Sequence, residues 1–165
     1  MKKALFIILL IGIQLFAQHK TTETGLSLIK DFEGLSLKAY QCPAGILTIG
    51  YGHTGPELKK GSYINKTQAD ALLIADCVRF EKYINKTIVR LLRWYEFDAL
   101  VSFTFNTGFR LKGQLKQSID EGNTKTAVYL LMRFNKAGAQ ILSGLTKRRK
   151  AETILYEKGL YNAKH

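Results

Sequence analysis

The chain has 165 residues, enough for one globular domain with room for two lobes. Lys and Arg number 25 against 13 Asp and Glu, and the formal net charge of +12 favours an anionic partner: nucleic acid, an acidic membrane face or an anionic cell-wall polymer. Two cysteines exclude a disulfide-dense scaffold and a four-thiolate zinc site, and a hydrophobic fraction of 46% with only two prolines excludes a largely disordered chain.

The first 17 residues differ from the rest. Lys2 and Lys3 make the start of the chain basic, and residues 4–17 are apolar apart from Gln14. This pattern, with the small Ala17 at its end, predicts a secretory signal peptide over 1–17 and a mature domain over 18–165. The mature chain would keep a charge of +10 and be secreted or periplasmic. An uncleaved anchor that tethers or later releases the domain, and a buried helix, are the alternatives.

Periodicity predicts a helix over residues 22–34, with apolar residues about every third position and Gly34 as its stop. Residues 40–55 then carry Pro43 and four glycines, with β-forming residues at 46–49. That composition predicts a small antiparallel sheet with tight turns. It is the only β region that the sequence indicates.

Helices are predicted to follow. A capping box over Thr67–Asp70 marks the start of one, and residues 94–105 form a strongly apolar helix suited to the core. Asn123 can cap a helix through residue 134, and a last helix is expected over about 146–158. The predicted class is α+β, with a small N-terminal sheet, a mainly helical lobe and a ligand cleft between them.

Glu33 is the first candidate catalytic residue. It is expected at the end of the first helix, where the partial negative charge of the helix terminus disfavours an ionised carboxylate. Phe32 and Leu35 could add desolvation, and both effects favour the protonated form that a general acid requires. Taken alone, Glu33 fits an ordinary surface glutamate better than a catalytic residue.

The spacing around Glu33 is more specific. Eight residues separate it from Cys42, five separate Cys42 from Thr48, and the run IGYGHTG follows at 49–55. This order resembles the phage-type lysozymes, the endolysin muramidases of glycoside hydrolase family 24, whose catalytic Glu is followed by Asp or sometimes Cys, then Thr and a glycine-rich hairpin. Further blocks resemble that family in its order: 97–108, 134–138 and 144–152. The resemblance covers essentially the whole mature chain.

The resemblance implies a lysozyme-like fold and hydrolysis of the β-1,4 bond between N-acetylmuramic acid and N-acetylglucosamine in peptidoglycan, by a monomer without cofactor or metal. Glu33 would protonate the glycosidic oxygen, while Cys42 and Thr48 would hold and activate the attacking water. Cys42 departs from the commoner Asp, and a thiol with an ordinary pKa of about 8.5 is mostly neutral at neutral pH. The alternative for Cys42 is a small buried loop residue.

His53 titrates near neutrality and could act in catalysis. The resemblance instead favours a pair with Asp76, which would tie the sheet to the helical lobe. Cys77 is expected to be a small core residue. A disulfide between Cys42 and Cys77, which would block the second catalytic position, stays open.

Arg148 and Asn106 are expected near the cleft, and Arg149 is not. Arg148, on the last helix, is expected to approach Glu33 and support its geometry, whereas Arg149 is expected on a solvated basic face. Asn106, beside Gly108, suits a hydrogen bond to an acetamido group, and a helix C-cap is its structural alternative.

Other functions remain open at this point. A lytic transglycosylase of similar fold needs the acid but no second carboxylate, so Cys42 permits it although Thr48 argues against it. A non-catalytic wall-binding module or a cationic antimicrobial would use the charge without explaining the spacing of Glu33 and Thr48. No nucleic-acid partner is expected, because the basic residues are dispersed and no recognition motif is present. Membrane contact is expected only transiently, through the N-terminal segment.

Overall fold

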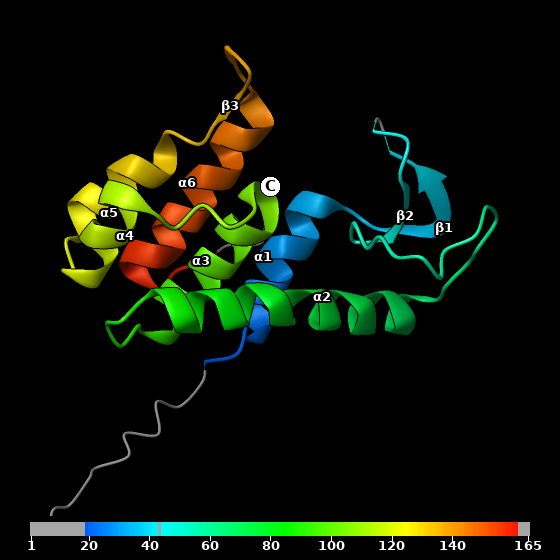
Figure 1. Cartoon of the computed structure of the whole chain (residues 1–165), viewed down its shortest axis with the longest axis horizontal. Coiled ribbons are helices and arrows are strands. Elements are labelled where there is room, and N and C mark those ends of the chain that lie inside the picture. Colours follow the sequence, from blue (N-terminus) through cyan, green and yellow to red (C-terminus); the bar gives the residue numbers. More distant parts are fainter. Residues whose placement is uncertain (1–18, 43, 162–165) are drawn as a thin grey trace, which may run out of the picture.

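The computed structural model describes residues 19–42 and 44–161, so the predicted signal peptide lies outside the described residues. Its elements, in chain order, are α1 (Glu23–Glu33), β1 (Ser36–Gln41), β2 (Leu47–Gly50), α2 (Lys66–Thr87), α3 (Trp94–Thr107), α4 (Gly113–Asp120), α5 (Thr124–Met132), β3 (Lys136–Ala137), β4 (Gln140–Ile141) and α6 (Ser143–Lys158). Strands β1 and β2 pair antiparallel, with Tyr40 opposite Thr48. The α+β class with a small N-terminal sheet and a mainly helical lobe is therefore confirmed (Figure 1).

Helix α3 is the centre of the helical lobe. Every residue from Glu96 to Thr104 is buried, and α3 packs against α1, α2 and α6. The prediction of an apolar core helix over 94–105 is confirmed, with two further residues at its C-terminal end. Because α1 and α6, which carry candidate site residues, both pack against α3, this helix fixes their positions relative to each other.

Helix α2 connects the two lobes. It has 22 residues, which at about 1.5 Å per residue makes it roughly 33 Å long. It contacts both β2 and α3, and Figure 1 shows it running beneath the sheet and the helical lobe. The position of the sheet relative to the helical lobe is therefore fixed along one continuous helix.

The predicted capping box of α2 is wrong by two residues. Asn65, not Thr67, is the N-cap: its side chain accepts the N–H of Gln68 at 2.9 Å, and the Gln68 side chain accepts the N–H of Asn65 at 2.8 Å. The Asn-x-x-Gln sequence satisfies two free N–H groups reciprocally, so it defines the start of the helix.

Three predictions in the second half also need correction. A second antiparallel pair, β3 with β4, shows that the prediction of only one β region is wrong, and Gly138, with a φ of +59°, forms the turn of this hairpin. Helix α4 was not predicted, because its short polar sequence buries only Leu115, Ser118 and Ile119. Helix α6 begins at Ser143, three residues before the predicted start, since the Thr146 N–H donates to the Leu142 carbonyl at 2.9 Å.

A buried carboxylate fixes the N-terminus of α1. Asp98 of α3 is fully buried and accepts the backbone N–H groups of Thr22 at 2.9 Å and Gly25 at 3.1 Å, together with the Thr22 hydroxyl. Burial raises the pKa of Asp98, against the opposing effect of these hydrogen bonds. A Cβ on Gly25 would stand 2.7 Å from Asp98 Cγ, so glycine is needed for this close approach. The other end of the same helix carries Glu33.

Replacing this carboxylate should destabilise the protein. In Asp98→Ala the N–H groups of Thr22 and Gly25 stay buried without an acceptor, so we expect the free energy of unfolding to fall by about 2–3 kcal/mol. Denaturant titration followed by circular dichroism measures the change. Glu23→Ala, an exposed carboxylate in the first turn of the same helix, is the control and should lose no more than about 0.5 kcal/mol. Equal losses in the two variants would show that Asp98 does not hold α1.

Candidate functional site

Glu33 is the last residue of α1, as the sequence predicts. The helix ends there because Gly34 adopts a φ of +70°, and the Gly34 N–H donates to the Lys30 carbonyl at 3.1 Å. The Glu33 side chain is 23% exposed. Its Oε2 atom would lie 3.9 Å from a Cβ placed on Gly52, so one carboxylate oxygen faces the turn after β2.

Arg148 holds the other oxygen of Glu33. Its Nη1 donates to Glu33 Oε1 at 2.5 Å, its Nε to Glu152 Oε1 at 3.1 Å and its Nη2 to the Ser102 carbonyl at 3.2 Å. Arg148 itself is 3% exposed. A guanidinium fixed by α3 and α6 therefore defines the position of the Glu33 carboxylate, and the expected approach of Arg148 to Glu33 is present in the structure.

Arg149 does not lie on a solvated face, so that expectation is wrong. It is fully buried, with Nη2 donating to Glu152 Oε1 at 2.9 Å and to Asn106 Oδ1 at 3.0 Å. Its guanidinium also lies over the Phe103 ring, 5.0 Å from the centroid. Burial lowers the pKa of Arg149, although the Glu152 charge opposes this effect. Consecutive arginines on α6 thus hold Glu33 and Asn106 while sharing one buried carboxylate.

Asn106 lies in the last turn of α3. The C-cap of α3 is Gly108, so the C-cap alternative for Asn106 does not describe the structure. Asn106 is exposed and lines a pocket of ≈ 400 Å³ together with Glu33 and Arg148. A neighbouring pocket of ≈ 460 Å³ also contains Asn106 and adds the cationic Arg110 and Lys136. The two pockets share Asn106 and Leu145 as lining residues, so they adjoin, with Glu33 in one and the basic residues in the other. We call the two pockets together the groove.

The remaining two candidate catalytic residues lie together on the β1–β2 hairpin. Cys42 is half-buried, and Thr48 is buried with its Oγ1 donating to the Ile46 carbonyl at 3.1 Å. Backbone hydrogen bonds at Ile46 and Ala44 hold the pKa of the Cys42 thiol below its ordinary value, and a hydrogen bond with the Thr48 side chain acts in the same direction. Neither residue is among those lining the pocket at Glu33.

The two cysteines have opposite environments. Both are free thiols in the structure, so no disulfide joins them there. Cys77 is 1% exposed in the core, as predicted, and burial raises the pKa of its thiol to about 12. Because only the thiolate is a good nucleophile, Cys42 is the cysteine expected to react with alkylating reagents.

His53 connects the hairpin to α2. Its Nδ1 lies 2.9 Å from Asp76 Oδ2, the contact expected from the sequence, and its Nε2 lies 2.7 Å from Glu57 Oε1. Burial disfavours the charged imidazole, but the hydrogen bonds to Glu57 and Asp76 outweigh it and raise the pKa of His53. Since both ring nitrogens face carboxylates, the protonated form serves as a structural bridge.

This bridge predicts how stability depends on pH. The pKa of His53 is raised above 6.5 in the folded state, so its contribution is complete below that value and is lost as pH rises through the folded-state pKa. We expect the gap in free energy of unfolding between the wild type and His53→Gln to shrink from about pH 5 to about pH 8.5. Urea titrations across this range measure the gap. A gap that stays constant or widens would contradict a charged bridge.

Two kinds of feature are absent from the part of the chain that the structure describes. Within residues 19–42 and 44–161, no cluster of three or more His, Cys, Asp or Glu side chains could hold a metal ion. Over the same ranges, no helix is long and apolar enough to cross a membrane.

Two further residues support the site, and the sequence alone assigned no role to either. Glu152 is fully buried between the two arginines, and Ser102 donates its hydroxyl to Glu152 Oε1 at 2.8 Å. The spacing of Arg148, Arg149 and Glu152 is a detectable signal, because residues three and four apart on a helix lie side by side. Ser102 is 50 residues away from Glu152 and gives no such signal.

Comparison with known proteins matches the phage lysozyme family model to residues 30–152 of the chain. The endolysin of Bacillus phage PZA is 38% identical over 143 residues, a match covering 84% of this chain and 55% of that protein. The endolysin of Acyrthosiphon pisum secondary endosymbiont phage 1 is 39% identical over 142 residues, covering 82% of this chain and 97% of that protein. The chain thus matches about half the length of the Bacillus phage protein.

Among solved structures, the endolysin from Escherichia coli O157:H7 phage FAHEc1 is similar with a TM-score of 0.81 and 34% sequence identity. The similarity covers 87% of this chain and 97% of that chain. The match therefore extends over both the small sheet and the helical lobe.

Proposed function

Because the chain belongs to the phage lysozyme family, we propose that it is a muramidase that hydrolyses the β-1,4 bond between N-acetylmuramic acid and N-acetylglucosamine in peptidoglycan. The observation that carries the proposal is the placement of Glu33. Its carboxylate is fixed by the buried Arg148 at one end of a groove that continues past Asn106. A polymeric glycan needs such an extended groove, with one acid placed at the bond to be broken.

Glu33 is proposed as the general acid. Arg148 occupies Oε1, so the proton to be transferred would be carried on Oε2 and given to the glycosidic oxygen as the bond breaks. The leaving sugar would otherwise depart as a poor alkoxide. Asn106 is proposed to contact an acetamido group of the substrate. Because Arg149 donates to Asn106 Oδ1, the orientation of the side-chain amide is fixed, and its N–H groups remain to donate to that acetamido group.

Cys42 and Thr48 are proposed to hold the water that attacks the anomeric carbon. The hydrogen bond between their side chains and the lowered pKa of Cys42 support this role, since the thiolate can accept a proton from water. For this role, Cys42 has to approach the sugar from the β1–β2 hairpin, while Glu33 approaches it from the end of α1.

The role of Cys42 predicts a contrast among variants. Cys42→Asp should remain active, because a carboxylate can also orient and activate water, whereas Cys42→Ala should lose activity by about tenfold or more. Alkylation should inactivate the enzyme, and substrate should protect it. Turbidity loss of purified cell walls measures these activities. Cys77→Ala is the matched control and should change mainly stability, by about 1 kcal/mol. Full activity in Cys42→Ala would reduce Cys42 to a loop residue.

The proposed function is tested by digesting purified peptidoglycan and analysing the products. A muramidase produces new reducing ends at N-acetylmuramic acid. Products ending in 1,6-anhydromuramic acid would instead identify a lytic transglycosylase, in which Glu33 acts without an attacking water. Binding of the chain to cell walls with no new ends would favour a non-catalytic wall-binding protein.

The place of action is proposed from the sequence. Residues 1–17 would direct the chain across the membrane, as a cleaved signal peptide or an uncleaved anchor, and the domain would act as a monomer on glycan strands outside the cytoplasm. The net charge of +12 is compatible with binding to anionic cell walls.

A further inference from the structure

The segment between α2 and α3 exposes apolar side chains at the far end of α1 from Glu33. Val89 is 72% exposed and Leu91 is 70% exposed, and Trp94 at the start of α3 is 46% exposed. The segment is ordered, because the Val89 N–H donates at 2.9 Å to Asp120, whose carboxylate also pairs with Lys116. Isolated exposed apolar residues are common, but three within six positions form a patch that needs an explanation. We name Val89, Leu91 and Trp94 the loop patch.

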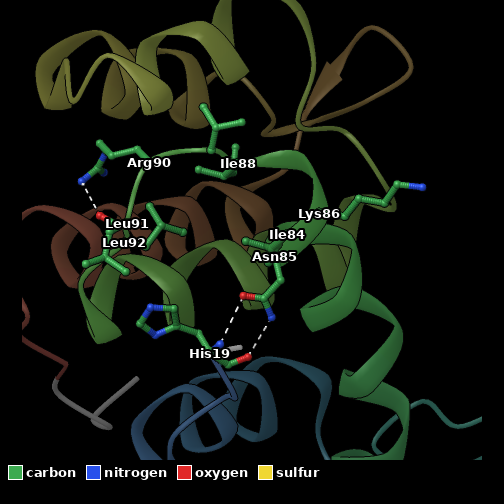
Figure 2. Close-up of a pocket in the computed structure, with 9 residues that line it drawn as sticks. His19, Ile84, Asn85, Lys86, Ile88, Arg90, Leu91 and Leu92 are labelled. Atoms are coloured by element: carbon green, nitrogen blue, oxygen red, sulfur yellow. Dashed lines mark hydrogen bonds between the residues drawn. The ribbon is translucent and has the colours of Figure 1, made fainter. Parts of the chain in front are cut away.

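The loop patch borders a pocket of ≈ 230 Å³ (Figure 2), and Val89 and Leu91 are among its lining residues. His19 lines the same pocket, where its N–H donates to Asn85 Oδ1 at 3.2 Å and its carbonyl accepts from Asn85 Nδ2 at 2.9 Å. The His19 ring packs 5.4 Å from the Phe97 ring. The chain therefore enters the domain at this pocket, and only Gln18 separates His19 from the apolar run of residues 4–17.

Several basic residues line the pocket beside the loop patch or lie close to the patch in the chain. Lys20 and Lys86 are exposed, and Figure 2 shows the Lys86 side chain extending away from the pocket. Arg90 and Arg93 both pair with the buried Glu96, so two guanidinium groups face one carboxylate and one positive charge remains. An apolar patch beside net positive charge is complementary to an anionic lipid surface, since apolar side chains enter the interface and cations contact phosphates.

We propose that the loop patch docks on an anionic phospholipid bilayer. The chain enters the domain beside the loop patch, so in the uncleaved form insertion of residues 4–17 into that membrane would hold the patch against the lipid headgroups. Trp94, a member of the patch, suits the headgroup level. Glu33 lies at the opposite end of α1, so the loop patch and the candidate acid are at different ends of that helix. The inference goes beyond glycan cleavage and does not depend on it.

The chain carries its own reporter, because Trp94 is its only tryptophan. The full chain is mixed with vesicles of phosphatidylglycerol and phosphatidylcholine whose acyl chains carry bromine, which quenches nearby tryptophan. We expect Trp94 emission to shift to shorter wavelength and to be quenched, with both effects weakened by high salt and on vesicles of phosphatidylcholine alone. Cleavage activity is measured separately, so failure of the proposed function would leave this result unchanged.

Two variants make the test specific. The double variant Val89→Ser, Leu91→Ser should bind the vesicles about fivefold more weakly or worse and lose Trp94 quenching. Ile74→Ser, which removes an apolar side chain 52% exposed on α2, is the control and should behave like the wild type. Vesicle binding without quenching of Trp94 would overturn the proposal, because residues 4–17 alone would then account for binding. Protection of Trp94 from a soluble quencher before vesicles are added would also overturn it, since the chain itself or a second copy would then cover the patch.

Discussion

The Glu33→Gln variant is expected to fold normally and to lose peptidoglycan cleavage by about 10²–10⁴-fold. Glutamine is nearly isosteric and can still accept the Arg148 hydrogen bond through its carbonyl oxygen, but its amide cannot donate a catalytic proton. Turnover is measured on purified cell walls, and the melting temperature is measured in parallel.

The control for this variant is Glu23→Gln. Glu23 is an exposed glutamate in the first turn of the same helix, so its amide should leave turnover unchanged. Near wild-type turnover in a folded Glu33→Gln protein would remove Glu33 from the mechanism. If Glu33→Gln also lowers the melting temperature, turnover is compared at a temperature where both variants are folded, so that unfolding does not account for the lost activity.

The second large effect is expected on stability. Arg148→Met leaves Glu152 fully buried with only Arg149 as a cation and frees the Glu33 carboxylate, so we expect the free energy of unfolding to fall by about 3–5 kcal/mol. Methionine keeps much of the apolar stem of arginine, so lost packing contributes little. Urea denaturation at neutral pH measures the change.

Lys147→Met is the matched control for Arg148→Met. Lys147 precedes Arg148 on α6 and is exposed, so its replacement should change the free energy of unfolding by no more than about 0.5 kcal/mol. A similarly small change in Arg148→Met would mean that Ser102 and Arg149 alone are enough to stabilise the buried Glu152 carboxylate. In that case Arg148 would act only on the position of Glu33, which a drop in turnover would reveal.

The predictable part of the site lies within one short stretch of chain. Glu33, Cys42 and Thr48 are separated by fixed spacings, and the stop at Gly34 and the hairpin glycines are local signals. The contact between Glu33 and Arg148 spans 115 residues, so it was accessible only through family resemblance. The burial of Arg149 was missed because a charged residue on a helix is usually solvated, and its buried partners become visible only when α3 and α6 pack.

The errors in the fold have a related cause. The start of α2 was misplaced because Thr67–Asp70 and Asn65–Gln68 are both plausible capping sequences, and only the hydrogen bonds at Asn65 decide between them. The β3–β4 hairpin has two residues in each strand, too few to show alternation of polar and apolar side chains. Short elements of this kind are fixed by their neighbours rather than by their own pattern.

The boundaries of the β1–β2 region have a consequence for protein engineering. Residues 35–64 lie between Gly34, where a Cβ would meet nothing within 4 Å, and the self-contained cap of α2 at Asn65. Cys42 and Thr48 belong to this insert, while Glu33 and Arg148 belong to the frame around it. We therefore expect that residues 35–64 can be exchanged for those of a relative, which would change the residues proposed to hold water while leaving Glu33 and Arg148 in place. Such an exchange has to keep the contacts between this insert and α2, among them the His53–Asp76 pair and the approach of Gly50 to Ala69, whose Cβ a Cβ on Gly50 would meet at 3.6 Å.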